Sequence, residues 1–385
     1  MGLTKVHKRV YGLDILRAFA ILAVVYSHGL QFLPKYISKW ASFFDYDGVA
    51  VFFVLSGFLI GSILIKTLEK EGPNFKALLV FMYKRWFRTL PPYYLILSFL
   101  TFYYSIWGDV NPWQIKKQFV FLENFNRPHP DFFPEAWSLA VEEWFYLLVP
   151  FTAFVLTRFV NPKHVLLLVI LSVILVTPVI RYNKGLAVVS LADWDAILRK
   201  QVITRLDSII FGLLGAYINY YYHHYWLKWK VPAFVIGLLL FLFVSYSYST
   251  TFVPNLGGYN GIYYTVLSFS LTSFAVLLVM PVMNNVKHGT GFFHRTVTFV
   301  SLISYSMYLV NLTVVQFILV PLTVKYLLLS NDILPYCKYG LFWFYTIFLS
   351  YLLYTYFEKP TMQLRDKLIS RKRAKEVQVT YNVNK

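Results

Sequence analysis

Long apolar stretches recur along the chain and are separated by short polar segments. Each stretch runs for about 20 residues, the length that an α-helix needs to cross the hydrocarbon core of a membrane. The chain is too interrupted to form one coiled coil and too apolar to be disordered. The pattern therefore predicts an all-α fold, a polytopic membrane helical bundle with about ten transmembrane helices at residues 14–33, 48–66, 86–106, 138–157, 164–181, 204–222, 231–249, 261–283, 299–324 and 337–357.

Lysine and arginine are distributed unevenly between the two sides of these spans. With the N-terminus in the cytoplasm, the inner segments hold 23 of the 36 basic residues, which agrees with the positive-inside rule. An even number of spans returns the C-terminus to the same side, so we expect both termini to be cytoplasmic. Residues 1–360 are predicted to form a single transmembrane domain and 361–385 a basic cytoplasmic tail. The longest outer stretch, 107–137, is predicted to be an ordered capping loop.

Composition agrees with a membrane protein: of 385 residues, 58% are hydrophobic and 14% are charged, with a mean hydropathy of +0.54. The formal charge of +18 invites a nucleic-acid interpretation. However, the basic residues lie mostly in short loops and tails, where topology explains them better, and we expect no nucleic-acid partner. The single cysteine, Cys337, excludes an intramolecular disulfide and a thiolate metal site.

The first span carries three ionisable residues on one stripe. His28 follows Arg17 by eleven residues, which places the two side chains within about 20° of one helix face and about 16 Å apart. Asp14 precedes Arg17 by three residues and shares the stripe. Ionisable groups inside a membrane normally face a protein interior or a water-filled path and indicate a functional site. His28 alone among the histidines lies well within a span, and no neighbouring spacing suggests a metal site.

Two further polar groups stand at span ends. Arg85 and Arg88 lie three residues apart, hence on one helix face, and suit either a phosphate ligand or lipid head groups. Glu142 and Glu143 point about 100° apart. Glu142 shares a face with Ser138, four residues earlier, and we expect an outward-facing polar pocket there, on the same side as His28.

Other polar residues within the spans have simpler interpretations. Ser56 precedes Gly57 in an apolar run, which favours a close helix contact or a kink. Arg205 and Asp207 are two residues apart and do not face each other, so each is expected to pair with another span. Asn311 lies in the middle of a span and is expected to form a hydrogen bond to another helix.

Seven motifs together resemble the acyltransferase-3 family of membrane proteins, which O-acylate cell-surface sugars and other acceptors. No single motif is decisive, but all seven occur in the family order, and the resemblance extends from about residue 11 to 361. The motifs are LDILRAFAILAVVYSHG, GVAVFFVLSGFLIG, KRWFRTLPPYY, WSLAVEEWFYL, RLDSIIFGLLGA, ISYSMYLVN and FEKP.

The resemblance implies a function and roles for particular residues. Members commonly transfer an acetyl group from cytoplasmic acetyl-CoA to an acceptor hydroxyl, often of a saccharide, on the outer side of the membrane. His28 matches the catalytic histidine, Arg17 its partner in the motif, and Arg85 and Arg88 the residues implicated in acyl-CoA recognition. Glu142 is expected to act with His28. The residues expected to line the path or bind substrate are Asp14, Ser56, Ser138, Arg205 and Asn311.

Two positions depart from the family pattern. Ala50 replaces an aspartate that often follows Gly-Val, and Asn311 replaces a histidine, which puts in doubt any mechanism that needs a second histidine. The chain is expected to be a stand-alone form without an appended esterase-like domain, in a bacterial inner membrane. His28 either deprotonates the acceptor hydroxyl or carries the acyl group itself.

Two other functions stay open at this point. The buried ionisable residues also fit a proton-coupled transporter or exporter, although no internal repeat supports one. A purely structural membrane protein is the third possibility.

Overall fold

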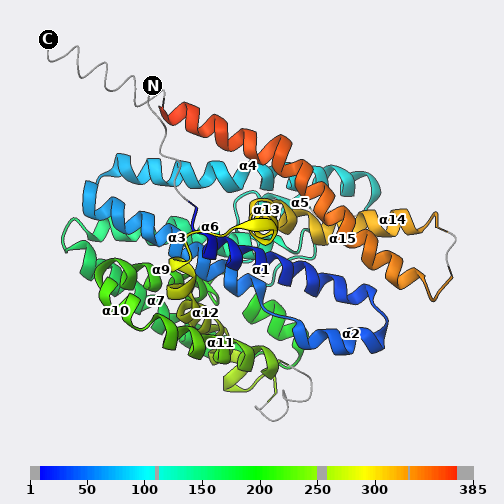
Figure 1. The fold of residues 1–385 in the computed structure, drawn as a ribbon, viewed down its shortest axis with the longest axis horizontal. Helices are drawn as coiled ribbons and strands as arrows, with labels where there is room; N and C mark the ends of the chain where they lie inside the picture. Colours follow the sequence, from blue (N-terminus) through cyan, green and yellow to red (C-terminus); the bar gives the residue numbers. More distant parts are fainter. Residues whose placement is uncertain (1–8, 109–111, 249–257, 328–329, 371–385) are drawn as a thin grey trace.

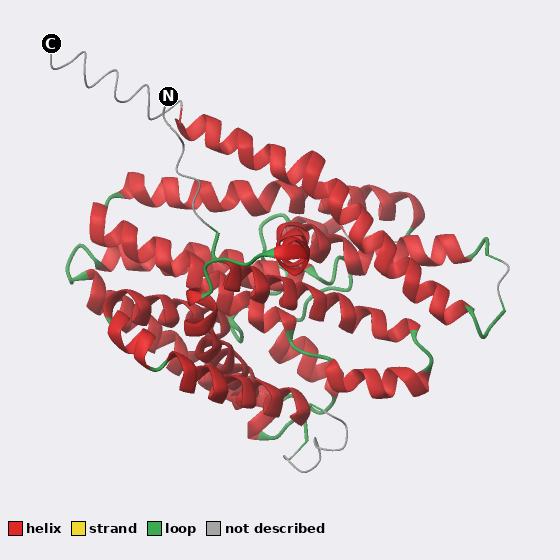
Figure 2. Cartoon of the chain, viewed as in Figure 1, coloured by secondary structure: helices red, strands yellow, loops and turns green. Residues whose placement is uncertain are grey.

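The computed structural model describes residues 9–108, 112–248, 258–327 and 330–370, and these form helices and loops without a β-strand (Figure 2). Each predicted span coincides with a long helical segment (Figure 1). These segments are α1 (Tyr11–Gly29), α3 (Gly48–Glu71), α4 (Phe75–Trp107), α6 (Ala136–Leu156), α7 (Pro162–Gly185), α9 (Leu206–Tyr221), α11 (Lys230–Ser247), η5 (Tyr263–Leu267) with α12 (Ser268–Asn285), α13 (Gly291–Val310) with η6 (Asn311–Leu319) and α14 (Val320–Val324), and α15 (Leu334–Leu353) with η7 (Tyr354–Glu358).

Shorter helices lie in the connections. They are η1 (Leu30–Phe32), α2 (Lys35–Ala41), η2 (Ser42–Phe44), α5 (Pro112–Gln118), α8 (Leu191–Asp193), η3 (Trp194–Arg199) and α10 (His223–Lys228).

Among the described residues, eight helical segments are long and apolar enough to cross a membrane. The other two segments at predicted spans are α4, which carries basic residues in its first half, and α9, which has 16 residues. A helix satisfies its backbone hydrogen bonds internally, as a hydrocarbon environment requires. The prediction of an all-α polytopic membrane bundle is confirmed.

Glycines bring α3 and α9 into close contact. A Cβ atom on Gly57 would lie 2.0 Å from the carbonyl oxygen of Ile209, and one on Gly212 would lie 2.1 Å from that of Val54. Only glycine allows two helix backbones to approach so closely. The close helix contact predicted at Gly57 is confirmed, and it fixes the position of α3 against the rest of the bundle.

The stretch between α4 and α6 folds into the bundle instead of capping it. The Tyr93 hydroxyl donates a hydrogen bond to the Gln118 carbonyl oxygen at 3.0 Å. Tyr93 precedes Trp107, the last residue of α4, by about 20 Å of helix, so the connection runs back along α4. Consequently α6 begins deep in the structure, where Thr89 of α4 donates to Glu143 of α6 at 2.9 Å.

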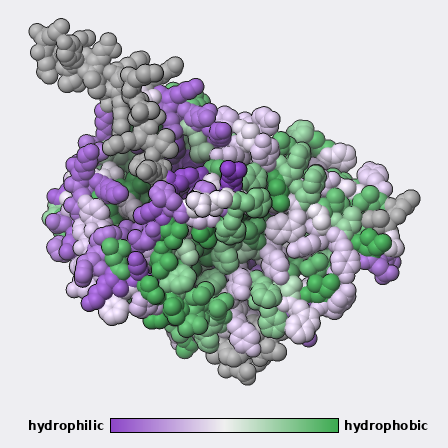
Figure 3. Space-filling view, in the orientation of Figure 1, coloured by the Kyte–Doolittle hydropathy of each residue, from purple (hydrophilic) through white to green (hydrophobic). Residues whose placement is uncertain are grey.

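The described chain begins and ends at the same end of the bundle. In Figure 1, α1 starts and the last helix ends toward the left of the view, and hydrophilic side chains gather on that side in Figure 3. Arg9 and Met362 line the same cavity, as an even number of crossings requires. The helix that includes α15 and η7 continues to Ser370. The rest of the predicted tail, 371–385, lies outside the described residues.

Candidate active site

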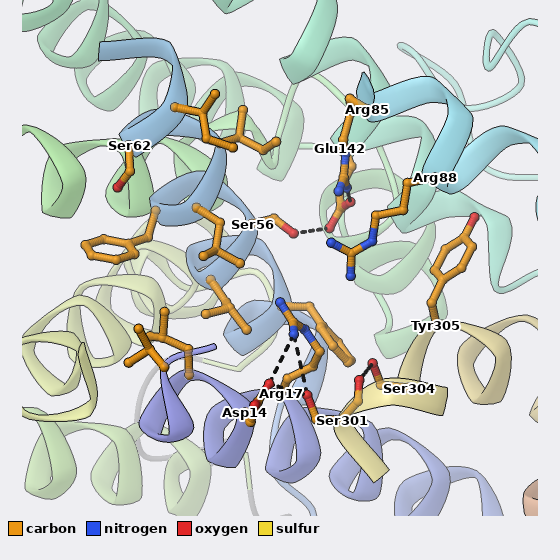
Figure 4. Close-up of a pocket in the computed structure, with 18 of the residues that line it drawn as sticks. Asp14, Arg17, Ser56, Ser62, Arg85, Arg88, Glu142, Ser301, Ser304 and Tyr305 are labelled. Carbon is orange, nitrogen blue, oxygen red and sulfur yellow. Dashed lines mark hydrogen bonds and ion pairs between the residues drawn. The ribbon is translucent and has the colours of Figure 1, made fainter. Parts of the chain in front are cut away.

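A large cavity opens between α1, α3, α4, α6 and α13 (Figure 4). Its volume of about 1030 Å³ is at the upper end of the range for ligand pockets. Basic side chains outnumber acidic ones in its wall, so the cavity favours an anion. The basic residues are Arg9, Arg17, Lys66, Lys70, Arg85, Arg88 and Lys287, and the acidic residues are Asp14, Glu71, Glu142 and Glu358.

Asp14 and Arg17 occupy one side of this cavity, a helical turn apart on α1. The Asp14 carboxylate accepts hydrogen bonds from Arg9 at 2.6 Å and from the Ser301 hydroxyl of α13 at 2.8 Å. Nη1 of Arg17 lies 3.5 Å from Asp14 and 3.4 Å from the Ser301 oxygen. Both contacts are long and involve only one nitrogen, so Arg17 retains donors for a ligand.

Arg85 and Glu142 form an ion pair across the cavity wall. Nη2 of Arg85 donates to Glu142 at 2.8 Å and to the Tyr146 hydroxyl at 2.5 Å, and Tyr146 donates to the same carboxylate at 2.8 Å. The Ser56 hydroxyl donates to the other carboxylate oxygen at 2.9 Å. The Arg85 guanidinium also lies over the Tyr146 ring, 4.1 Å from its centre. Arg85 and Glu142 thus neutralise each other and are held rigidly.

Arg88 has a different environment one helical turn later. Its half-buried side chain lines the cavity and makes no hydrogen bond or ion pair with any described residue, although the Glu358 carboxylate on the same cavity wall attracts it electrostatically. Figure 4 shows the guanidinium groups of Arg17, Arg85 and Arg88 directed toward the same space. A guanidinium without a partner in a low-dielectric cavity attracts phosphate oxygens strongly. Arg88 is therefore the best-placed residue to bind an anionic ligand.

The position of Glu142 corrects one expectation. We expected an outward-facing pocket at Glu142, on the side of His28 and opposite Arg85, whereas Glu142 is bound to Arg85. The inward fold of the stretch before α6 accounts for the difference, because it brings the start of that helix to the level of Arg85. The seven predicted residues that line this cavity are Asp14, Arg17, Ser56, Arg85, Arg88, Ser138 and Glu142.

His28 and Asn311 do not line the cavity but contact each other. Nδ1 of His28, in the last turn of α1, lies 2.5 Å from Oδ1 of Asn311, the first residue of η6. The inter-helix hydrogen bond predicted for Asn311 is confirmed. His28 is half-buried, whereas Asn311 is completely buried.

Tyr308 and Ser138 form the cavity wall nearest to this pair. Both residues are buried and line the cavity, and their hydroxyl oxygens lie 2.6 Å apart. The Tyr308 hydroxyl also donates to the backbone carbonyl of Glu135 at 2.9 Å. Tyr308 precedes Asn311 by one helical turn, so the pair of His28 and Asn311 lies one turn beyond the wall.

A second group of charged residues acts on His28 from the connection between α7 and α9. Arg199 and Lys200 are the charged side chains within electrostatic reach of the His28 ring. Both bind Asp195, Lys200 at 2.6 Å. Although burial opposes ionisation, these two cations lower the pKa of Asp195 below its usual value. The Arg199 guanidinium lies over Trp137, 5.3 Å from the ring centre.

Arg205 lies apart from the cavity and from the pair of His28 and Asn311. It approaches Asp47 at 3.7 Å and stacks on Phe269, 4.3 Å from the ring centre. Asp207 forms a fully buried ion pair with Arg181 of α7 at 2.8 Å. The prediction that each pairs with another span is confirmed for Asp207, whereas Arg205 approaches Asp47, which precedes the first residue of α3. Arg205 does not line the cavity.

Several residues at the site were missed in the sequence. Tyr146 and Ser301 hold charged groups through hydroxyl hydrogen bonds, and Tyr308 forms the wall beside Ser138, but in an aromatic-rich, apolar chain they carry no distinctive signal. Tyr146 does follow Glu142 by four residues, and that spacing was a usable hint. Among the described residues, no group of three or more histidine, cysteine, aspartate or glutamate side chains is placed to hold a metal ion.

The fold and the cavity define an integral membrane protein with a polar, basic site inside its helical bundle. A family model described as an acyltransferase domain matches residues 10–365. The chain therefore belongs to the acyltransferase-3 family, as the sequence motifs indicated.

Similarity to individual proteins points the same way. The chain is 34% identical over 181 residues to a peptidoglycan O-acetyltransferase, OatA, of Listeria monocytogenes, which covers 42% of this chain and 27% of that protein. It is 33% identical over 165 residues to a putative peptidoglycan O-acetyltransferase, YrhL, of Bacillus subtilis, covering 38% and 24%. With an O-acetyltransferase, OatA, of Staphylococcus aureus it shares 26% identity over 80% of this chain and 51% of that protein.

The chain thus spans between about a quarter and a half of the length of these relatives. No solved structure matches the chain. The family match favours acyl transfer over the transporter and the purely structural alternatives.

Proposed function

We propose that this protein is a membrane O-acetyltransferase that moves an acetyl group from cytoplasmic acetyl-CoA to a hydroxyl of a cell-wall saccharide. The observation that carries the proposal is the basic cavity with an Arg88 side chain that makes no hydrogen bond or ion pair with any described residue, in a chain of the acyltransferase-3 family. The names of the similar proteins support O-acetyl transfer and a peptidoglycan acceptor. A bacterial cytoplasmic membrane is the location that such an acceptor implies.

The cavity suits the donor for electrostatic and steric reasons. Coenzyme A carries several phosphate negative charges at one end and a thioester at the other. Arg88 and Arg17 have free donors for phosphate oxygens, and Lys66, Lys70 and Lys287 add positive charge. The uneven distribution of basic residues along the chain supports a cytoplasmic mouth. Arg85 is committed to Glu142, so its role is to shape the cavity.

His28 is the residue to which we assign the chemistry. Its Nε2 accepts the proton of the acceptor hydroxyl while the hydroxyl oxygen forms a bond to the acetyl carbonyl carbon. The bond from that carbon to sulfur then breaks, and the proton passes from His28 to the departing thiolate. The Tyr308 and Ser138 wall separates the cavity from His28 by one helical turn, so the thioester reaches His28 past these two hydroxyls.

The acceptor side is proposed to include Trp137, Asp195 and Arg199. Sugars are commonly bound by an aromatic ring together with charged or polar hydrogen-bonding groups. Trp137 lies under Arg199, and Arg199 and Lys200 act on the His28 ring. These groups thus combine a buried aromatic ring that Arg199 covers, a carboxylate and cations near the histidine.

The test uses the full chain in proteoliposomes with labelled acetyl-CoA and soluble peptidoglycan fragments. We expect label on the glycan, and we expect His28→Ala to abolish it. His164→Ala is the matched control, because His164 is exposed at the start of α7 and its loss should leave transfer intact. Absence of transfer by the wild-type protein would refute the function, and full activity of His28→Ala would refute the role of His28. Label retained on the protein without acceptor would instead assign His28 as the acetyl carrier.

A further inference from the structure

The side-chain amide of Asn311 can adopt only one orientation. Nδ2 donates to the backbone carbonyl oxygens of Met307 at 2.8 Å and Tyr308 at 2.9 Å. An amide nitrogen has two hydrogens, and both are used. Reversing the amide would bring Oδ1 against two carbonyl oxygens and leave the completely buried side chain with repelling contacts. Oδ1 is therefore the atom that faces His28.

This orientation determines which nitrogen of His28 carries the proton. Oδ1 of Asn311 is only an acceptor, so the 2.5 Å contact is a hydrogen bond only when Nδ1 of His28 is the donor. A neutral imidazole has a single N–H. With that hydrogen on Nδ1, Nε2 keeps its lone pair. Nε2 forms no hydrogen bond with any described residue and is not enclosed, because the His28 side chain is half-buried.

We propose that Asn311 is a positioning residue that holds His28 in the tautomer with the proton on Nδ1, which leaves Nε2 free to take the hydroxyl proton. This inference rests on the function proposed above. The amide is neutral, so it selects the tautomer while favouring the charged imidazolium less than a carboxylate would. Arg199 and Lys200 are the charged groups that act on the ring.

The local helix geometry is consistent with a specialised position. Asn311 begins the π-helix η6, and the backbone N–H of Thr313 donates to the Glu135 carboxylate at 3.1 Å. Wide helical turns of this kind often occur at functional sites. A purely structural hydrogen bond between helices is the competing interpretation, and it predicts a loss of stability only.

The test compares pH–rate profiles of the full chain in proteoliposomes. For Asn311→Ala we expect kcat to fall about 10- to 100-fold, with an unchanged KM for acetyl-CoA. Asn311→Asp keeps an acceptor at the same place but adds a negative charge that favours the imidazolium. We therefore expect its activity to be low near neutral pH and to recover at high pH, with the acid limb displaced upward by about one unit or more. Thr313→Val is the control, because Thr313 lies in the same helical segment as Asn311 and its hydroxyl donates a buried hydrogen bond to Glu135. Its substitution should lower stability without moving the pH–rate profile.

The outcomes separate this inference from the proposed function. An Asn311→Asp profile that coincides with the wild-type profile would refute the positioning role, as would an Asn311→Ala protein with wild-type kcat. Failure of the wild-type protein to transfer acetyl groups would refute the function instead. The tautomer itself can then still be read from the ¹⁵N shifts of His28, assigned by comparison with His28→Ala. Protonation at Nε2 in that spectrum would overturn the inference.

Discussion

Arg85 and Arg88 look equivalent in the sequence, but their surroundings predict different consequences of substitution. Arg88 makes no hydrogen bond or ion pair with any described residue, so Arg88→Ala removes no such contact from the folded protein. In the proposed complex with acetyl-CoA, the Arg88→Ala protein would lose charge-assisted hydrogen bonds to phosphate, which contribute about 1.5–3 kcal/mol to the free energy of binding. At about 1.4 kcal/mol per tenfold change, KM for acetyl-CoA should rise about 10- to 150-fold. The thermal midpoint should stay at its wild-type value.

Arg85→Ala should behave differently, because it leaves the Glu142 carboxylate without its cation. The side chains of this pair are each 12% exposed, and breaking a buried pair costs about 3–5 kcal/mol. Because both side chains are partly exposed to solvent, we expect the loss of stability to lie toward the lower end of this range. The thermal midpoint should therefore fall, and the double variant Arg85→Ala with Glu142→Ala should recover part of it, since no unpaired charge remains.

The assay measures initial rates of acetyl transfer against acetyl-CoA concentration in proteoliposomes, together with thermal midpoints of the same preparations. Arg88→Lys is the matched control: it keeps the charge but loses the planar fork, so its KM should lie between those of wild type and Arg88→Ala. A KM for Arg88→Ala within twofold of the wild-type value would refute the assignment of Arg88 to donor binding. A lower midpoint for Arg88→Ala would show that the residue has a structural partner.

Three further predictions concern stability. Gly57→Ala should lower the thermal midpoint because its Cβ meets a backbone carbonyl of α9, whereas Gly340→Ala, with open space around it, should not; equal midpoints would contradict the contact. Arg181→Met should destabilise by about 3–5 kcal/mol by stranding Asp207, and adding Asp207→Leu should restore most of it; a double variant no more stable than the single one would argue against this. Burial raises the pKa of Glu123, outside the membrane helices, to about 8 from 4.5. The folded protein therefore retains a proton on Glu123 that the unfolded chain loses, so stability falls as pH rises from about 4.5 to 8. The thermal midpoint of Glu123→Gln, measured relative to wild type, should increase over that pH range. A constant difference between the two midpoints would contradict the burial of this carboxyl.

The helices could be predicted from the sequence because each membrane span is nearly independent of the others. A run of about 20 apolar residues forms a helix in a membrane whatever its neighbours are, since it satisfies its own backbone. For the same reason the stripe of Asp14 and Arg17 could be read directly, because both residues lie on one helix and three-residue spacing fixes their relation. Both residues line the cavity.

The relations between helices could not be derived in this way. The Arg85 to Glu142 pair joins residues 57 positions apart, and its existence depends on how deeply the intervening stretch folds inward. That depth is set by contacts such as the one from Tyr93 to Gln118, which no periodicity reveals. The pairing of His28 with Asn311 spans 283 positions, and only the expectation of an inter-helix partner for Asn311 was available from the sequence.

The structure also changes how the ionisable residues within the membrane should be weighed. In the sequence, Arg85 and Arg88 had the same indication of function, and Asp207 was expected to pair with another span. In the folded chain Asp207 is fully paired inside the bundle, and Arg85 is bound to Glu142. Each of these therefore has a sufficient structural reason to be buried. Arg88 has only the electrostatic attraction of Glu358 and no hydrogen bond or ion pair among the described residues, and a cation so weakly compensated beside a cavity is costly unless a ligand offsets the cost. Unused hydrogen-bonding capacity facing a cavity, rather than charge alone, therefore distinguishes the proposed donor site from the scaffold that holds it.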